Sequence, residues 1–205
     1  MKTFINILKK FYWDIRTKLG RDTYIAWLIK DIPGECGIEI RKIWYGKKLK
    51  KAGENLLIQP GTVIVNPQNI EVGDNVSIGI SSMIQAGGGL VVKSNAMFGP
   101  YVKIWTQNHL YEDPNKPINL QGYQFNPVEI GEDVWIGANA FIMPGAKIGD
   151  KCIISASSVV GGKIYPDRLI LAGNPARKIG VRGGQHPTEH STSGEDNGIK
   201  DGGRE

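Results

Sequence analysis

An aliphatic side chain returns at every sixth position between residues 128 and 160. The positions that keep this period are Ile130, Ile136, Ile142, Ile148, Ile154 and Val160. A small or β-branched side chain stands four residues after most of them, at Val134, Ala140, Ala146, Cys152 and Ser158. Because six is an even number, these positions share one side of an extended strand, whereas no helix has a period of six. Short strands bent apart by the intervening glycine, aspartate and asparagine residues therefore predict a β-solenoid of stacked coils.

The same period extends toward the N-terminus with two irregular steps. It starts near Ala52 and continues through Ile58, Ile64, Val72, Ile78, Ile84, Val92, Phe98 and Ile104. The steps over 64–72 and 84–92 are each two residues too long, so we expect the corners to bulge at Asn69 and at 87–89. Glycine is abundant, with 27 of 205 residues and no collagen triplet, which fits a turn-rich solenoid.

The period stops after Ile104 and resumes after residue 127. Residues 105–127 contain three prolines and no periodic aliphatic position, so we expect them to leave the solenoid as a loop. Long loops in an otherwise regular domain are usually functional. This loop holds His109, the only histidine outside the C-terminal tail, which makes His109 the first candidate for chemistry.

Positive charge is concentrated in the N-terminal quarter of the chain. Residues 1–51 carry 13 lysines and arginines against 5 aspartates and glutamates, whereas the remaining residues carry 12 against 15. The two cysteines, Cys36 and Cys152, do not suggest a disulfide framework, and we expect reduced thiols in the cytoplasm. Asp14 and Arg16 interrupt the first apolar residues, so a signal peptide is not expected.

Residues 3–19 have the spacing of a basic amphipathic helix. Its apolar positions are Phe4, Leu8, Phe11, Ile15 and Leu19. Two compatible interpretations are open: a cap over the first coil, which we favour, or a helix on the anionic inner face of a membrane with Trp13 and the lysines as anchors. We assign residues 1–51 as a helical, basic cap, 52–180 as the solenoid, and the polar residues 181–205 as a disordered tail.

Three blocks carry a resemblance to a known family: NHLYEDP at 108–114, IGEDVWIGANAFIMPGAKIGDK at 130–151 and AGNPARKIG at 172–180. Over residues 52–180 the chain resembles the hexapeptide-repeat acyltransferases, and within them the maltose/galactoside and capsular-polysaccharide O-acetyltransferases. The resemblance implies an all-β fold, a left-handed parallel β-helix, assembled as a homotrimer. It also implies a saccharide acceptor and acetyl-coenzyme A (acetyl-CoA) as co-substrate in the cleft between neighbouring coils, with the loop of one subunit reaching another. Neither a metal ion nor a nucleic acid is expected.

The family's catalytic histidine falls on His109. Transfer of an acetyl group from a thioester to a sugar hydroxyl requires a base for the hydroxyl proton, and an imidazole, which titrates near neutrality, suits that role. Glu112 and Asp113 follow closely, and either could orient the imidazole as a carboxylate does in a triad. Equally, both could be solvated loop charges. A backbone N–H of a coil is the expected donor to the oxyanion.

Five residues match positions that bind the cofactor in the family. Ala138 and Ala156 are small, as a surface for the slender pantetheine arm requires. Arg177 and Lys178 stand where the 3′-phosphate of coenzyme A is bound, and guanidinium and ammonium groups pair with phosphate. Trp135 stands at the tryptophan of the family's VWIG block, where it either contacts the active-site loop or packs at a coil corner.

The acceptor pocket departs from that of the galactoside acetyltransferases. An asparagine that contacts the sugar there corresponds to Gly79 here, with Ser81 and Ser82 nearby. Asn108 and Tyr123 of the loop are further candidates for the acceptor site, and Phe125 lies on the same returning limb. A simple galactoside or maltose acceptor is therefore in doubt, whereas a polysaccharide, a lipid-linked sugar or a sugar nucleotide remains open.

Three alternatives to O-acetylation of a saccharide remain. The first is N-acetylation of an amino-sugar nucleotide. The second is a zinc carbonic anhydrase of the γ class, which shares the β-helix but needs three histidine ligands, whereas 52–180 contains only His109. The third is a β-helix scaffold without catalysis.

Overall fold

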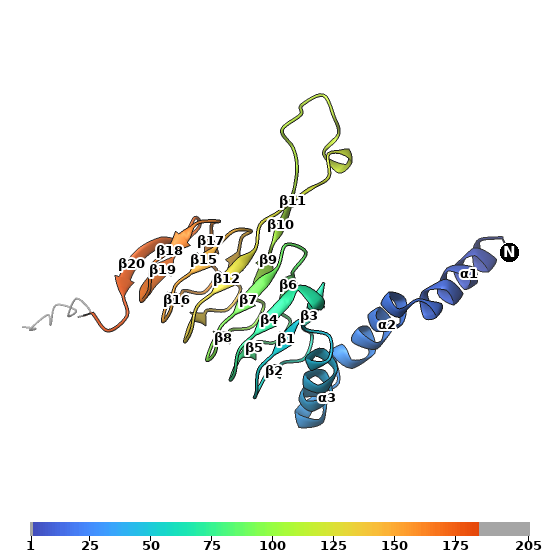
Figure 1. Ribbon diagram of the computed structural model, residues 1–205, viewed down its shortest axis with the longest axis horizontal. Coiled ribbons are helices and arrows are strands. Elements are labelled where there is room, and N and C mark those ends of the chain that lie inside the picture. Colours follow the sequence, from blue (N-terminus) through green and yellow to red (C-terminus); the bar gives the residue numbers. More distant parts are fainter. Residues whose placement is uncertain (1, 185–205) are drawn as a thin grey trace, which may run out of the picture.

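The computed structural model describes residues 2–184 as three helices followed by a three-sided prism of short strands (Figure 1). The helices are α1 (Lys2–Arg16), α2 (Lys18–Lys30) and α3 (Gly34–Gly46). Each full coil of the prism contributes one strand to each of three parallel sheets. The β-solenoid that the six-residue period predicts is confirmed.

The three sheets are the faces of the prism, named here face A, face B and face C. Face A consists of β1 (Lys51–Ala52), β4 (Ile70–Val72), β7 (Leu90–Val92), β12 (Val128–Ile130), β15 (Lys147–Ile148) and β18 (Ile164–Tyr165). Face B consists of β2 (Leu57–Ile58), β5 (Ser77–Ile78), β8 (Met97–Phe98), β13 (Trp135–Ile136), β16 (Ile153–Ile154), β19 (Leu169–Ala172) and the antiparallel β20 (Arg177–Val181). Face C consists of β3 (Val63–Val65), β6 (Met83–Gln85), β9 (Lys103–Trp105), β14 (Phe141–Ile142) and β17 (Val159–Val160). The chain passes from A to B to C, so its corners are named AB, BC and CA.

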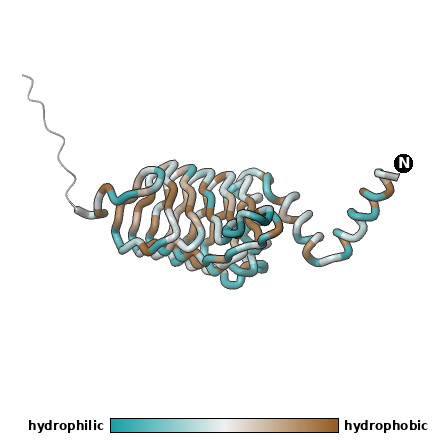
Figure 2. Tube along the Cα trace, turned by 90° about the horizontal axis from the view of Figure 1, so that it is seen from above, coloured by the Kyte–Doolittle hydropathy of each residue, from teal (hydrophilic) through white to brown (hydrophobic). Residues whose placement is uncertain are grey.

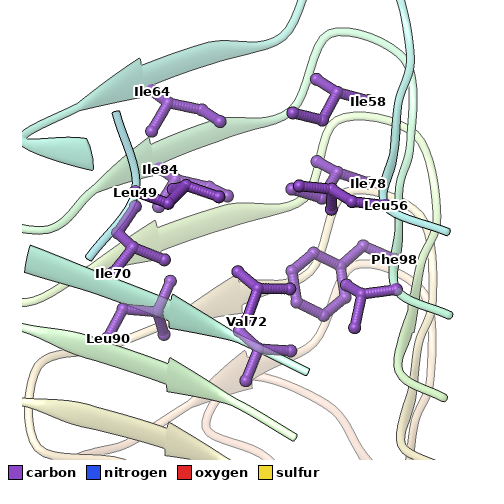
Figure 3. A pocket seen from close by; sticks show the side chains of 12 residues that line it. Leu49, Leu56, Ile58, Ile64, Ile70, Val72, Ile78, Ile84, Leu90 and Phe98 are labelled. Atoms are coloured by element: carbon purple, nitrogen blue, oxygen red, sulfur yellow. The ribbon is translucent and has the colours of Figure 1, made fainter. Parts of the chain in front are cut away.

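The periodic side chains point into the prism and form its core. All of them from Ile58 to Val160 are buried, while Ala52 in the first strand is exposed. Figure 3 shows how isoleucines from faces B and C meet Leu90 and Val72 of face A inside the first coils. Burial of one such side chain contributes about 1.5–3 kcal/mol, so the stack of coils supplies its own stability. The apolar positions repeat along the whole prism (Figure 2).

The corners have left-handed backbone conformations, which explains their residue types. At corner AB, Asn55, Asn75 and Asn95 have φ of 53°, 56° and 63°, a region that asparagine tolerates well. Their side-chain amides form a ladder, with Nδ2 to Oδ1 distances of 2.9 and 3.1 Å. Corner CA holds both predicted bulges, a 3₁₀ turn at Pro67–Asn69 and the glycines 87–89.

Helix α3, not the N-terminal helix, covers the first coil. Arg41 of α3 is fully buried, and its Nε donates to the carbonyl oxygen of Ile58 at 2.8 Å. Its Nη1 donates to the carbonyl oxygens of Ile29 at 3.1 Å and Ile32 at 2.8 Å, so one guanidinium ties the end of α2 to the prism. The expectation that residues 3–19 form the cap is therefore wrong, because the clamp to the first coil comes from Arg41.

The segment 3–19 is also not one helix. Thr17 interrupts it, and its Oγ1 accepts a hydrogen bond from the N–H of Gly20 at 3.0 Å as the N-cap of α2. Helix α1 projects away from the prism (Figures 1 and 2), and all of its described side chains are exposed. Within 2–184, no helix combines the length and apolar composition that crossing a bilayer requires.

The ordered chain continues further at the C-terminal end than predicted. Strand β20 reaches Val181, and Arg182 then forms an ion pair with Asp133 at 2.9 Å. These contacts hold residues that the sequence assigns to the disordered tail. The rest of that predicted tail, residues 185–205, lies outside the described residues.

Candidate active site

The loop at corner CA is built as a projecting hairpin. Strands β10 (Gln107–His109) and β11 (Tyr123–Phe125) pair antiparallel, so its stem is regular and not structureless as the sequence suggests. Thr106 anchors the stem, because it is buried and its Oγ1 accepts from the N–H of Gly88 at 2.7 Å and donates to the carbonyl of Gln85 at 3.1 Å. The hairpin therefore extends from the corner on a paired and anchored stem (Figure 1).

His109 lies at the outer end of this stem and is exposed. Its cross-strand partner is Tyr123, and the centroids of the two rings are 4.4 Å apart. Asn108 is exposed on the same strand, but side-chain alternation turns it to the opposite side of the ribbon from His109. The tyrosine ring lies tilted against the imidazole, with 37° between the two ring planes, so the exposed His109 has an aromatic neighbour on one side.

The two carboxylates after His109 form hydrogen bonds within the loop. Glu112 Oε2 accepts from the N–H of Tyr111 at 3.0 Å, and Asp113 Oδ1 accepts from the N–H of Asn115 at 2.9 Å. In this conformation both carboxylates stabilise turns of the hairpin. Their role in orienting His109 remains a prediction.

Gln121 holds the tip of the hairpin together. Its Nε2 donates to the carbonyls of Asp113 at 2.9 Å and Lys116 at 2.7 Å, and its Oε1 accepts from the N–H of Asp113 at 3.1 Å. This role is not predicted from the sequence, because a loop glutamine has no spacing that reveals its partners.

Corner BC is the second part of the site, and it carries a strip of small residues. Ala138 and Ala156 occupy equivalent places in successive coils, since the N–H of Ser157 donates to the carbonyl of Ala138 at 2.8 Å. Glycines stand beside them: a Cβ on Gly99 would lie 2.7 Å from the nitrogen of Ala138, and one on Gly137 would lie 2.6 Å from that of Ala156. At these glycines the backbones pack too closely for a side chain, and beside them Ala138 and Ala156 carry only a methyl group.

Gly79 belongs to the same glycine column. It is buried, and a Cβ there would lie 2.4 Å from the carbonyl carbon of Gly99. No side chain can therefore extend from this position toward an acceptor. Ser81, two residues later, is partly exposed at the corner.

Tyr101 stands in line with Ser81 and Asn139 at corner BC and was missed from the sequence. Its φ is 60° and its side chain is 55% exposed. A bulky residue in the left-handed region is rare and strained by about 1–3 kcal/mol, and such strain collects at functional sites. Lys103 borders the same corner, and its Nζ donates to Asn139 Oδ1 at 2.8 Å.

The basic residues Arg177 and Lys178 lie at the C-terminal end of this strip. Strand β20 folds back on β19, with Arg177 opposite Ala172 and Lys178 opposite Leu171. Leu171 pairs with Ile154, two residues before Ala156 in the preceding coil. The two basic residues, which lie opposite Leu171 and Ala172, therefore follow Ala156 along the prism. The structure therefore brings the two alanines and the two basic residues to one edge of the prism.

Trp135 flanks the strip from face B, where it stacks between Met97 and Ile153 of the neighbouring coils. Its side chain is about half exposed, so it lines the surface and does not pack inside the core. Among the side chains of the described part of the chain, no three histidine, cysteine or acidic residues are grouped as metal ligands.

Within one subunit, the two parts of the site lie at different corners. His109 projects from corner CA, whereas the small residues and cations lie at corner BC, with the whole of face C between them. One subunit therefore does not bring the imidazole and the strip together.

Comparison with known proteins places the chain in a family. The description "Bacterial transferase hexapeptide (six repeats)" matches residues 127–162. The galactoside O-acetyltransferase of Escherichia coli is 30% identical over 143 residues, 69% of this chain and 68% of that protein. The chain belongs to the hexapeptide-repeat acetyltransferases. The resemblance drawn from the three sequence blocks is thereby confirmed.

Other members of the family show the same likeness. A Saccharomyces cerevisiae protein named as an acetyltransferase is 35% identical over 62% of this chain, which spans 63% of its length. An Escherichia coli protein named as a colanic acid biosynthesis acetyltransferase is 28% identical over 64% of this chain and 69% of its own. The crystal structure of a galactoside acetyltransferase in complex with coenzyme A superimposes with a TM-score of 0.69 at 26% identity, covering 78% of each chain. These family members support the left-handed form of the β-helix.

Proposed function

We propose that the protein is an acetyl-CoA-dependent O-acetyltransferase that acts on a sugar hydroxyl of a polysaccharide, a lipid-linked glycan or a related saccharide. The observation that carries the proposal is His109, the one described histidine of this hexapeptide-repeat acetyltransferase, held out from the prism on an antiparallel hairpin. An exposed imidazole at the outer end of the hairpin stem has access to a large acceptor.

His109 acts as the general base. One imidazole nitrogen accepts the proton of the acceptor hydroxyl while the hydroxyl oxygen bonds to the thioester carbonyl carbon. The tetrahedral intermediate then collapses, the carbon–sulfur bond breaks, and the imidazolium returns the proton to the leaving thiolate. No other co-reactant is required, since acetyl-CoA and the hydroxyl supply every atom of the acetyl ester and the free thiol.

Corner BC fits acetyl-CoA as the second substrate. The strip formed by Ala138 and Ala156 offers a surface without obstructing side chains, as an extended pantetheine arm needs. Arg177 and Lys178 at the end of the strip supply two cations for the 3′-phosphate. The coenzyme A complex of the structural relative supports this assignment.

The active site is completed between subunits of a homotrimer. Face A carries ion pairs on its outer surface, between Lys50 and Glu71 and between Glu129 and Lys147, both at 2.7 Å. Faces B and C expose apolar side chains such as Met97 and Val63, which suits contacts with neighbouring subunits. A three-fold assembly with heterologous contacts joins corner CA of one subunit to corner BC of the next.

The acceptor differs from a simple galactoside. Gly79 provides no side chain where the resemblance to the galactoside acetyltransferases implies an asparagine, and at the same corner Tyr101 is exposed and Ser81 is half-buried. The relative named for colanic acid biosynthesis supports an acceptor that belongs to a larger glycan.

The decisive experiment follows release of free thiol from acetyl-CoA in the presence of candidate acceptors. The panel comprises galactosides, polysaccharide fragments, lipid-linked sugars, sugar nucleotides and amino-sugar nucleotides. We expect thiol release that depends on a hydroxyl acceptor and is lost in His109→Ala. Equal turnover of His109→Ala and wild type would contradict the mechanism, and transfer to amines alone would contradict O-acetylation.

A further inference from the structure

Helix α1 presents an apolar face to solvent. Phe4, Leu8, Phe11 and Ile15 are 64%, 51%, 46% and 40% exposed. Their spacing of three or four residues places them on one side of the helix. An exposed face of this kind marks an interaction surface, because its burial removes a large apolar area from water.

Basic side chains border this apolar face on both sides. With about 100° between successive residues of a helix, Lys9 and Arg16 fall on one flank and Lys10 on the other. Asp14 is the only acidic residue of α1. Trp13, expected as an interfacial anchor, falls on the side opposite Phe4, so helical geometry excludes it from the apolar face. The anchors are the flanking cations.

Helix α2, between α1 and the prism, also exposes apolar side chains. Trp27 and Leu28 are each more than 60% exposed. Beside α2, a cleft of about 780 Å³ between α2, α3 and β3 is lined by Trp27 and Trp44 and rimmed by lysines 18, 30, 47 and 48. Two of these lysines form ion pairs, Lys30 with Asp31 at 2.8 Å and Lys48 with Asp22 at 2.7 Å. Helices α1 and α2 project beyond the first coil (Figure 1).

We propose that α1, supported by α2, binds the surface of an anionic lipid bilayer. The apolar face enters the boundary between headgroups and acyl chains, while Lys9, Lys10 and Arg16 contact the lipid phosphates. The buried Arg41 fixes the end of α2 to the prism, so membrane binding holds the catalytic prism at a defined distance from the bilayer. This inference does not depend on the acetyl transfer proposed above.

Charge favours a lipid partner over a second copy of α1. Two copies that meet through their apolar faces bring flanking lysines of like charge together. Anionic headgroups instead neutralise these lysines, and each basic residue near such a surface strengthens binding severalfold. A homotrimer places three copies of α1 at the same end, and linked weak contacts bind far more tightly than one.

The test is flotation of the full-length protein with vesicles. Phosphatidylcholine vesicles with phosphatidylglycerol are compared with vesicles of phosphatidylcholine alone, at low and high salt. We expect binding to the anionic vesicles only, weakened by salt because the Debye length shortens. Lys9→Gln/Lys10→Gln is expected to lower the partition coefficient about 10- to 30-fold, and Phe4→Ser/Leu8→Ser to abolish binding.

Two matched controls test whether lipid binding depends on α1 and not on any exposed lysine or apolar side chain of the protein. Lys151→Gln/Lys163→Gln removes two lysines from the prism, and Ile164→Ser removes an exposed apolar side chain from face A. Both control variants are expected to bind as the wild type does. Equal binding of the α1 variants and the wild type overturns the proposal, as does equal binding to neutral vesicles.

Two further measurements keep the alternatives distinct. Sedimentation of the lipid-free protein is expected to give the same oligomer for the wild type and Phe4→Ser/Leu8→Ser. A wild-type assembly that this variant dissociates would overturn the proposal in favour of a second copy. Transfer to a soluble acceptor without lipid is expected to be unchanged in the α1 variants, and its failure in all proteins would contradict only the proposed enzymatic function.

Discussion

Corners CA and BC of the prism are built in opposite ways. Corner CA breaks the repeat, with bulges at Pro67–Asn69 and 87–89 and then the hairpin that carries His109. Corner BC keeps the repeat, and its glycines allow successive coils to touch through their backbones. A regular coil cannot project a side chain far from the prism, and an irregular one cannot form a smooth edge. One sequence period therefore produces two kinds of corner: the projecting hairpin forms where the period is interrupted, and the close contact of coils forms where it is kept.

The largest expected effect tests whether the two corners work in different subunits. His109→Ala disables corner CA and is expected to lower kcat by about 10²–10⁴-fold. Ala156→Trp fills corner BC and is expected to raise the KM for acetyl-CoA strongly. Co-assembly of the two variants gives mixed trimers in which one of three sites combines an intact His109 with an intact strip. At equal mixing we expect recovery of about one quarter of wild-type activity.

Each variant mixed with itself serves as the control for this recovery and should remain inactive. Absence of recovery in verified mixed trimers would mean that one subunit supplies both corners. That result would require a rearrangement of the hairpin across face C.

The sequence predicts the prism well because its information is local. Ile136 and Ile142 are buried as the period requires, because each coil repeats the same short contacts. Asn69 and the glycines 87–89 stand at bulges, where the period has two extra residues. The projecting position of His109 follows from the interruption of the period. The family resemblance, and not the period, assigns its chemical role.

The contacts of Arg41 and Gln121 join residues far apart in the sequence, so the six-residue period does not predict them. Arg41 looks like one more basic residue of a charged segment, yet it is buried between α2 and the first coil. The same is true of Gln121, whose partners depend on how the hairpin closes. The position of Trp13 opposite Phe4, by contrast, follows from helical geometry alone and could have been predicted.

The second prediction concerns the close approach of coils at corner BC. Gly137→Ala adds a methyl group that would lie 2.6 Å from the nitrogen of Ala156, so the coils must separate. We expect the free energy of unfolding to fall by about 1–3 kcal/mol. Urea unfolding at a fixed protein concentration measures it. Ser155→Ala is the matched control, since Ser155 already has a Cβ in the equivalent place, and equal losses in both variants would refute the role of the glycines.

The third prediction concerns the order of the hairpin at corner CA. Gln121→Ala removes three hydrogen bonds that close the tip, and we expect about a tenfold lower kcat, because a small misplacement of a catalytic group slows the reaction. The thermal midpoint should hardly change, since the tip is exposed. Asn115→Ala should keep wild-type activity, because it retains the backbone N–H that donates a hydrogen bond to Asp113 Oδ1. A lower midpoint with unchanged kcat would assign Gln121 to stability alone.

The smallest expected effect concerns strain at Tyr101, the one tyrosine in the left-handed column of corner BC within the described chain. Asparagine adopts this conformation with less strain, so Tyr101→Asn should raise the free energy of unfolding by about 1 kcal/mol. Tyr101→Phe keeps the strain and should leave the free energy of unfolding unchanged. If the aromatic ring contacts the acceptor, Tyr101→Asn also raises the acceptor KM while the KM for acetyl-CoA stays the same. A more stable variant with unchanged kinetics would mean that the strain has no catalytic purpose, and corner BC would then serve acetyl-CoA alone.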